Sequence, residues 1–475
     1  MSTGFSGRFL FFEKLVQLMM GDQANLSANS HIGKVSGTMA RIATIQAREV
    51  LDSRGRPTVE VELRTACGKS GRAIAPSGAS TGKHEAVERR DGDRHWYAGL
   101  GVRGAVEAVN TSLSALISGM DPADQVAIDN AMIAADGTPN KGRLGANAIL
   151  AVSMAAAVTA AELQEVELYE HLHQLYLQKN PRARIIVPLP MVNMISGGLH
   201  AGGNLDFQDF LIYPEGCVSY REALERIVRV YNSLGRVLGK HGETHALVGD
   251  EGGYGPSLPT NETALERIME AIEVAGLKPG DDVSIALDVA SSHFYDADTN
   301  FYRLREWREA PRHAEEMIVF LAGLVGKYPI RSIEDGLAED DWSGWRSLNA
   351  ALGRKIQLVG DDLFTTQVGR IEKGIREQSA NAVLIKLNQV GTVSETFDAL
   401  AMAAGHGFRA VVSARSGETE DTFIADLATA SGCGQIKIGS VARSERLAKY
   451  NRLLRIEDHL GGPGVAVFQR RVPAG

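Results

Sequence analysis

The stretch "VVSARSGETED", residues 411–421, begins as a short apolar run and then turns polar at Arg415 and Ser416. A brief apolar run bounded by polar residues is typical of a buried strand. Because this run ends in a cation and a hydroxyl group, we expect the end of the strand to form the floor of a binding site.

Other short apolar runs along the chain also finish in a charged or hydroxyl side chain. They cover residues 245–251, 284–290, 331–336, 356–362, 382–388 and 434–440. Segments with helical apolar spacing separate some of these runs. One helical face in residues 221–242 carries Leu224, Ile227, Val228, Tyr231, Leu234 and Leu238. A second helix is expected in residues 261–280, with Asn261 as its N-cap and Gly276 near its end.

Alternating strands and helices predict a mainly parallel sheet with crossover connections. Polar groups at the end of every predicted strand favour a TIM-like β/α barrel, because catalysis in such barrels takes place on that face. The alternative, a doubly wound open sheet, would gather its site at one switch point. We therefore expect an α/β chain with a C-terminal β/α barrel.

The chain length of 475 residues predicts two domains. We expect a smaller α+β domain over residues 40–175 and the barrel over residues 185–460, followed by a tail at 461–475. The proline-containing segment 180–190, "NPRARIIVPLP", is interpreted as the linker that leads into the barrel. In the smaller domain, residues 58–65 alternate like a half-buried strand. Residues 149–161 form an Ala-rich apolar run that is too short to span a bilayer, so we expect a buried helix.

Residues 1–39 form an N-terminal extension. Residues 7–20, "GRFLFFEKLVQLMM", have helical apolar spacing, but Glu13 and Lys14 interrupt the apolar run and no clear cleavage site follows. This pattern does not predict a secretory signal. The expectation is a disordered tail, or a start codon placed too early with Met39 as the true beginning; the alternative is a partner-binding amphipathic helix.

The composition is that of a soluble globular protein, with 44% hydrophobic residues, 23% charged residues and a formal net charge of -8. No basic stripe is present to neutralise phosphates, which argues against nucleic acid as a partner, and no membrane partner is expected. The three cysteines, Cys67, Cys217 and Cys433, are few and widely spaced. They suit a reducing compartment, and a cytoplasmic location is expected.

Three acidic residues, Asp288, Glu334 and Asp361, end successive predicted strands. Carboxylates that converge on one barrel mouth repel one another unless a cation neutralises them. Oxygen-only ligands select a hard ion, so the pattern predicts Mg²⁺ before Zn²⁺. The alternative is that each carboxylate caps a helix or pairs with a basic residue on its own.

The next strands end in Lys386, in Arg415 with Ser416, and in Lys437. Cations that face an acidic metal site suit a small doubly anionic substrate that carries a phosphate and a carboxylate. A lysine among other positive charges and beside a metal has a depressed pKa, and it can act as a general base. The Gly-rich turn at 248–256 adds Glu251, and residues 76–82 form a loop of small hydroxyl residues.

Long segments of the chain, in register and in order, resemble the enolase (phosphopyruvate hydratase) family. The resemblance runs from about residue 40 to about residue 458. It rests on "SRGRPTVEVE" (53–62), "PSGASTG" (76–82), "KGRLGANAILAVS" (141–153), "VGDEGGYGP" (248–256), "ALDVASS" (286–292), "SIEDG" (332–336), "QLVGDDLF" (357–364), "IKLNQVGT" (385–392), "SGETEDTFIADLA" (416–428) and "QIKIGS" (435–440).

The resemblance implies the glycolytic reaction of that family, a reversible dehydration of 2-phosphoglycerate to phosphoenolpyruvate with two Mg²⁺ ions. Enolase-superfamily sites use a Lys or His base with bound Mg²⁺. By position, Lys386 would accept the C2 proton and Glu251 would protonate the leaving 3-hydroxyl group. The first Mg²⁺ would be bound by Asp288, Glu334 and Asp361.

The remaining positions of the resemblance concern substrate binding and the second ion. Arg415 and Ser416 would bind the phosphate, and Lys437 would contact the carboxylate. Ser80 would reach the second Mg²⁺ from a lid loop. The residues His200, on another closing loop, Gln208 and Asp209 would lie at the substrate. The family also implies a homodimer or a homo-octamer.

The chain departs from the family at two positions of the expected site. Asp209 stands where the family usually has glutamate, which shortens the reach by roughly 1.5 Å, and a misplacement of that size costs on the order of 100-fold in rate. Ala414 stands where the family has histidine, so a group expected near the phosphate is absent. His293 replaces a common glutamate at a position expected outside the site.

These departures leave three functions open. The first is the enolase reaction itself. The second is an enolase-like dehydratase for a related phosphonate or phosphinate substrate in specialised metabolism. The third is a surface-binding protein with weak or no activity.

Overall fold

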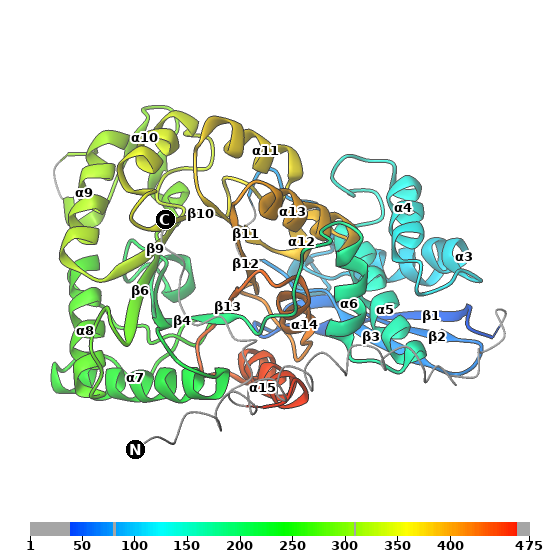
Figure 1. Ribbon diagram of the computed structural model, residues 1–475. Helices are drawn as coiled ribbons and strands as arrows, with labels where there is room; N and C mark the ends of the chain where they lie inside the picture. Colours follow the sequence, from blue (N-terminus) through cyan, green and yellow to red (C-terminus); the bar gives the residue numbers. More distant parts are fainter. Residues whose placement is uncertain (1–38, 79–81, 308–309, 463–475) are drawn as a thin grey trace, which may run out of the picture.

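The structure is a computed structural model that describes residues 39–78, 82–307 and 310–462. Its N-terminal unit is an antiparallel three-stranded sheet in the order β1-β2-β3, with helices packed against it (Figure 1). The strands are β1 (Ile42–Leu51), β2 (Pro57–Thr65) and β3 (Ser70–Ile74). The helices are α2 (Arg103–Ala108), α3 (Ser114–Ile117), α4 (Gln125–Asp136), α5 (Ala146–Gln164) and α6 (Leu168–Leu177).

Helix α5 is the core helix of this unit. The Ala-rich surface of α5 and Gly71 of β3 together allow the sheet and the helix to approach closely. The contact is so close that a Cβ on Gly71 would lie 2.4 Å from the backbone nitrogen of Thr159 on α5. By length and composition α5 is apolar enough to cross a membrane, but 83% of its apolar window is buried inside the protein. The expected buried helix is therefore observed.

The C-terminal unit is a closed barrel of strands in the order β10-β11-β12-β13-β4-β5-β6-β9. The N-terminal unit lies against one side of it (Figure 1). This arrangement confirms the expected fold class. The strands are β4 (Leu189–Ser196), β5 (Asp209–Pro214), β6 (Val283–Asp288), β9 (Ile330–Glu334), β10 (Gln357–Gly360), β11 (Ala382–Ile385), β12 (Arg409–Ser413) and β13 (Gln435–Gly439).

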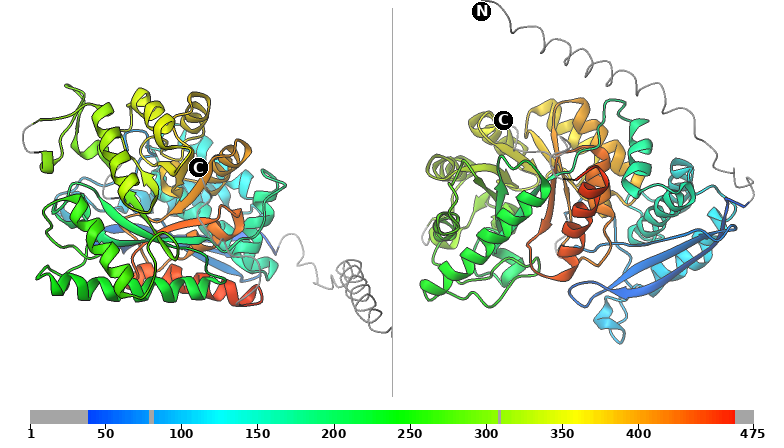
Figure 2. Two further views of the ribbon diagram at one scale, coloured as in Figure 1. Left: turned by 60° about the vertical axis from the view of Figure 1, so that its left-hand side comes forward. Right: turned by 60° about the horizontal axis from the view of Figure 1, so that its bottom comes forward.

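Helices cover the outside of the barrel, as the two further views show (Figure 2). The helices of this unit are α7 (Tyr220–Lys240), α8 (Asn261–Val274), α9 (Ala314–Lys327), α10 (Trp342–Leu352), α11 (Val368–Glu377), α12 (Leu387–Val390), α13 (Val393–Gly405), α14 (Phe423–Ser431) and α15 (Ser444–His459). A small hairpin of β7 (Tyr295–Asp296) and β8 (Phe301–Tyr302) precedes α9. The side chains of Ile227, Leu234 and Leu238 on α7 are buried, whereas Val228 is exposed.

Strand β5 runs antiparallel to both of its neighbours, while the other barrel pairs are parallel. In the pairing of β5 with β6, the first residue of β5, Asp209, lies opposite the last residue of β6, Asp288. The beginning of β5 therefore lies at the same end of the barrel as the C-terminal ends of the parallel strands.

Two local predictions are wrong. Residues 245–251 form no strand: Val248 makes only an isolated bridge to Tyr254, because the glycines of this segment fold it into a turn. The N-cap of α8 is Thr260 and not Asn261, since the Thr260 side chain accepts a hydrogen bond from the Thr263 backbone nitrogen. The segment interpreted as a linker, 180–190, already contains the start of β4.

Hydrogen bonds join the two units beside the barrel mouth. Ser77 and Gly417 form an isolated antiparallel bridge with reciprocal backbone bonds of 2.9 Å. The Asp421 carboxylate accepts a bond from the Ile74 backbone nitrogen at 3.0 Å. These contacts hold the segment after β3 over the end of β12.

Candidate active site

The barrel strands deliver the predicted site residues to one cavity. Asp288 and Glu334 are the last residues of β6 and β9, and Asp361 and Lys386 directly follow β10 and β11. Glu334 is buried and contacts Lys437, which lines the cavity. The residues that line it include His200, Gln208, Glu251, Asp288, Asp361, Lys386, Ala414, Arg415, Ser416 and Lys437.

Two lysine side chains pair with the three predicted metal ligands, Asp288, Glu334 and Asp361. Lys437 Nζ donates to Asp288 Oδ2 at 2.7 Å and to Glu334 Oε1 at 2.8 Å. Lys386 Nζ donates to Asp361 Oδ2. Burial, reinforced by the charge of Asp288, raises the pKa of Glu334 well above its usual value. The three carboxylates are therefore paired with two lysine ammonium groups on this side of the cavity.

The pKa of Lys386 differs from the sequence-based expectation. Burial acts to lower it, but the adjacent Asp361 carboxylate outweighs burial, and the pKa lies above its ordinary value. The prediction of a depressed pKa was made for a lysine beside a bound metal ion and other positive charges, whereas in the protein alone the nearest charged group is a carboxylate. Arg415 and Lys437 do act in the expected direction, but more weakly.

The carboxylates fit a hard divalent cation. Asp288, Glu334 and Asp361 are all buried and offer only oxygen donors, which Mg²⁺ prefers. Ligand atoms of Asp335, Asp361 and Asp362 lie within 4.8 Å of one another, as do those of His200, Asp209 and Glu251. Asp335 also accepts hydrogen bonds from the backbone nitrogens of Asp361 and Asp362, both at 2.9 Å, which orients the segment after β10.

Glu251 reaches the cavity from the Gly-rich turn at 248–256. The next residue, Gly252, has a φ of 89°, and a Cβ there would lie 2.6 Å from the Ala442 carbonyl oxygen. The turn therefore requires glycine at this position. Burial acts to raise the pKa of Glu251, but the positive groups around it, His200 first, bring it below its usual value.

Asp209 is fully buried behind His200, which itself lines the cavity. Asp209 Oδ2 lies 3.2 Å from His200 Nδ1, and Asn193 Nδ2 donates to Asp209 Oδ1. Burial opposes protonation of His200, but the Asp209 charge outweighs it and raises the pKa of His200 to about 9. Asp209 thus orients a protonated imidazole at the edge of the cavity.

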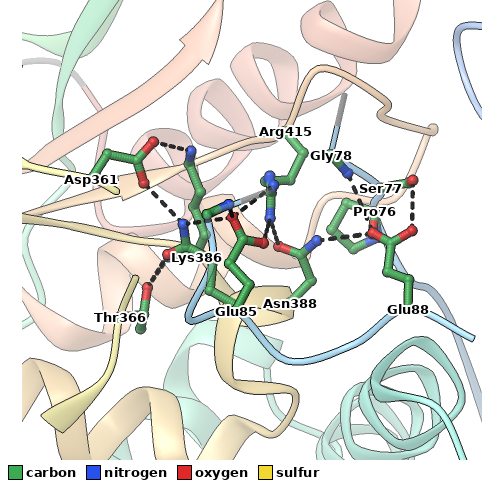
Figure 3. A network of polar contacts seen from close by, with 12 residues as sticks. Pro76, Ser77, Gly78, Glu85, Glu88, Asp361, Thr366, Lys386, Asn388 and Arg415 are labelled. Atoms are coloured by element: carbon green, nitrogen blue, oxygen red, sulfur yellow. Dashed lines mark hydrogen bonds and ion pairs between the residues drawn. The ribbon is translucent and has the colours of Figure 1, made fainter. Parts of the chain in front are cut away.

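The phosphate-binding candidates lie at the end of β12. Arg415 Nη1 donates to Asn388 Oδ1 at 2.7 Å and to Glu85 Oε2 at 2.9 Å (Figure 3). Ser416 Oγ accepts a hydrogen bond from Arg54 Nη1 at 3.1 Å. The fully buried Arg446 donates to the carbonyl oxygens of Arg415 and Ser416 at 2.6 and 2.7 Å.

The site differs from the sequence-based prediction at several residues. His293 lines the cavity, which corrects the expectation that it lies outside the site. Glu85 and Arg446 were not predicted, because each acts on Arg415 across a sequence distance that no local motif reports. Ser80, the predicted ligand of a second ion, lies outside the described residues.

Comparison with known families supports the assignment suggested by this geometry. Residues 42–172 match a family model described as the enolase N-terminal domain, and residues 184–470 match one described as the enolase C-terminal TIM barrel domain. The acidic groups at the barrel mouth agree with the Mg²⁺ that this family typically uses. With both domains matched in order over most of its length, the chain belongs to the enolase family.

Proposed function

We propose that this protein catalyses the reversible Mg²⁺-dependent dehydration of 2-phosphoglycerate to phosphoenolpyruvate. The observation that carries the proposal is the convergence of Lys386, Glu251 and Arg415 on one cavity whose wall also holds buried carboxylates. A base, an acid and an anion-binding group on one cavity are what a β-elimination next to a carboxylate requires.

In the proposed reaction each proton has a defined donor and acceptor. Lys386 Nζ, in its neutral form, accepts the C2 proton. The electron pair of the C2–H bond forms the new C2–C3 double bond as the C3–oxygen bond breaks. Glu251 supplies the proton with which the hydroxyl group leaves as water. Asp288, Glu334 and Asp361 would hold Mg²⁺, which would supply positive charge against the negative charge that develops on the substrate carboxylate.

The other residues of the cavity bind and orient the substrate. Arg415 is a planar donor suited to two phosphate oxygens, and Ser416 can add a hydroxyl donor beside it. Lys437, which lines the cavity, would contact the carboxylate, and the protonated His200 would offer a further positive group. Gln208 fixes the mouth by donating to Asp288 Oδ2 at 3.1 Å.

The direct test is turnover of 2-phosphoglycerate by the purified full chain, followed by the ultraviolet absorbance of the enol product. With Mg²⁺ we expect a kcat in the range of ordinary enzymes, about 1 to 1,000 per second. After removal of Mg²⁺ with a chelator, turnover should be lost and then restored by added Mg²⁺. Absence of turnover together with intact Mg²⁺ binding would refute the proposal.

One observation favours a second candidate, dehydration of a phosphonate or phosphinate relative of the same substrate. Ala414 and His293 both line the cavity, so two of the three departures from the family lie where a substrate would be bound. The test is the ratio of kcat/KM for 2-phosphoglycerate and for its phosphonate analogue. A ratio in favour of the analogue would replace the first candidate by the second.

We further propose that the protein works as a homodimer or homo-octamer in the cytoplasm. Cys67, Cys217 and Cys433 are all free thiols, which suits a reducing compartment. Light scattering after size-exclusion chromatography will give the number of subunits, and a mass equal to one chain would contradict the proposed assembly.

A further inference from the structure

The guanidinium group of Arg415 is already engaged by a carboxylate. Arg415 Nη1 lies 2.9 Å from Glu85 Oε2, and Nη2 donates to Glu85 Oε1 at 3.3 Å (Figure 3). Both side chains are almost fully buried, with 3% and 5% of their surface exposed. This contact joins residues 330 positions apart, one from each unit of the protein.

Glu85 has other hydrogen-bond donors within reach. The Gly82 backbone nitrogen donates to Glu85 Oε1 at 2.9 Å, and Gln389 Nε2 lies 3.4 Å from the same oxygen. Gln389 Nε2 also donates to Asp361 Oδ1 at 3.0 Å. The Glu85 carboxylate would therefore keep hydrogen-bond partners if its contact with Arg415 were broken.

A carboxylate with one oxygen on each terminal nitrogen occupies the same N–H edge of a guanidinium group that two phosphate oxygens use. Two anions cannot share this buried edge, because like charges at contact distance in a protein interior repel strongly. An incoming phosphate must therefore displace the carboxylate, and the cost of that exchange enters its binding affinity.

We propose that Glu85 acts as an internal competitor that holds Arg415 in the free protein and sets the affinity of this site for phosphate groups. The inference rests on the proposed role of Arg415 in phosphate binding. Glu85 is a positioning residue, since it acts through Arg415. Because a phosphate dianion carries more charge than a carboxylate, the exchange favours dianionic phosphates over ligands with a single negative charge.

The test is the Kd of inorganic phosphate for the full-length protein, measured by calorimetry at fixed ionic strength. Glu85→Gln removes the competing charge while keeping the size of the side chain. We expect the Kd to fall by about tenfold, because this change in affinity is only a modest part of the effect of breaking a buried ion pair. A purely structural ion pair predicts the opposite, an unchanged or weaker affinity.

Glu88→Gln is the charge-matched control. Glu88 accepts from Ser77 Oγ at 2.9 Å and from Arg90 Nη2 at 2.8 Å, and it lies 3.4 Å from Asn388 Nδ2, so it belongs to the same network. We expect this variant to change the Kd by less than about twofold, because its charge acts on Arg415 only from a distance. Equal gains in both variants would refute the specific role of Glu85.

Arg415→Gln separates this inference from the proposed function. If Arg415→Gln abolishes phosphate binding and Glu85→Gln leaves the Kd unchanged, the competitor role is wrong while the phosphate role of Arg415 stands. If Arg415→Gln binds phosphate as the wild type does, both are wrong. Should Glu85→Gln fail to fold, Glu85→Asp keeps the charge but shortens the reach, and a Kd no lower than that of the wild type would refute the inference.

Discussion

At the scale of single residues, Ala414 offers neither a charge nor a side-chain hydrogen bond to the cavity that it lines. Ala414→His would add a donor beside Arg415, at the position where the resemblance to the family implies a histidine. If 2-phosphoglycerate is the substrate, we expect kcat/KM to rise by about tenfold, the gain typical of one charge-assisted contact in the transition state. Steady-state kinetics of both proteins will measure it, and an unchanged or lower value would contradict the choice of substrate.

Lys386→Ala tests the proposed base. The loss of the amine should slow exchange of the C2 proton with solvent by at least about 100-fold, the lower end of the contribution of a general base. Mg²⁺ affinity should be preserved or increased, because Asp361 loses its competing cation. Exchange is measured by NMR in deuterated water, and Mg²⁺ binding by calorimetry.

Lys240→Ala is a suitable control for that experiment. Lys240 is an exposed residue at the end of α7 whose Nζ lies 2.8 Å from Glu270 Oε1. It is not among the residues that line the cavity. Its removal should leave exchange unchanged. Retained exchange in Lys386→Ala would show that another group removes the proton.

The residues at strand ends could be predicted from the sequence, because an apolar run fixes both the strand and the position of the side chain that ends it. Asp288, Glu334 and Lys386 are examples. The partners of these residues could not be predicted in the same way. Glu85 meets Arg415 only because two separate units pack together, and His293 enters the cavity through the path of the loop after β6.

At the scale of elements, the turn that carries Glu251 depends on Gly252. Gly252→Ala would force a side chain into a left-handed conformation and against the Ala442 carbonyl oxygen. We expect the free energy of unfolding to fall by at least about 1 kcal/mol, with a lower kcat as Glu251 shifts. Denaturant unfolding and steady-state kinetics measure the two effects.

Gly255→Ala is the matched control in the same turn. A Cβ at Gly255 would make only an ordinary contact of 3.7 Å with the Ala201 Cβ. This variant should change both quantities little. If the two substitutions had equal effects, the conformation of Gly252 would not be the cause.

Helix α6 contains a buried histidine that makes stability depend on pH. Burial lowers the pKa of His171 to about 4, and its Nδ1 lies 3.0 Å from Gln164 Oε1. Among the residues that the structure describes, nothing pairs with Nε2. The unfolded chain therefore takes up a proton more readily, near its ordinary value of about 6.5, than the folded protein does.

The stability that neutral His171 contributes is complete above about pH 6.5 and is lost as the pH falls toward 4. At pH 4.5 the loss amounts to about 2 kcal/mol by linkage. His171→Leu should reduce the fall in the free energy of unfolding between pH 7 and pH 4.5 by that amount. Urea unfolding at the two pH values measures it, and an identical pH dependence in the variant would contradict the prediction.

The alternation of helices and strands was predictable, but the start of the barrel was not. Residues 245–251 are apolar enough for a strand, yet Gly249 and Gly252 allow a turn that a periodicity argument does not detect. Strand β4 was hidden in a segment whose prolines indicate a linker. The reversed direction of β5 depends on pairing with two strands, which no local pattern encodes.

At the scale of the whole molecule, buried polar contacts join the two units. Asp129 of α4 accepts a bond from the Ser394 backbone nitrogen of α13 at 3.0 Å and another from Gln125 Nε2 at 3.1 Å. Asp129→Ala would leave the Ser394 donor buried without this acceptor. We expect a loss of about 1 to 3 kcal/mol in the free energy of unfolding, measured by denaturant titration.

Glu162→Ala, on the exposed part of α5, is the control and should remain within about 0.5 kcal/mol of the wild type. If Asp129→Ala were as stable as this control, the contact between the units would not contribute to stability.

Because strand β5 is reversed, the chain crosses the length of the barrel twice, through α7 and then α8, between β5 and β6. Because β5 begins at the mouth and ends at the base, α7 must return the chain to the mouth before α8 takes it back to the start of β6. Glu251 lies on that return turn and not at the end of a strand. The proposed proton donor and the proposed metal ligands are thus carried by separate segments of the chain. We therefore expect a substitution of Glu251 to change the proposed proton donation while Asp288, Glu334 and Asp361 keep their places at the cavity.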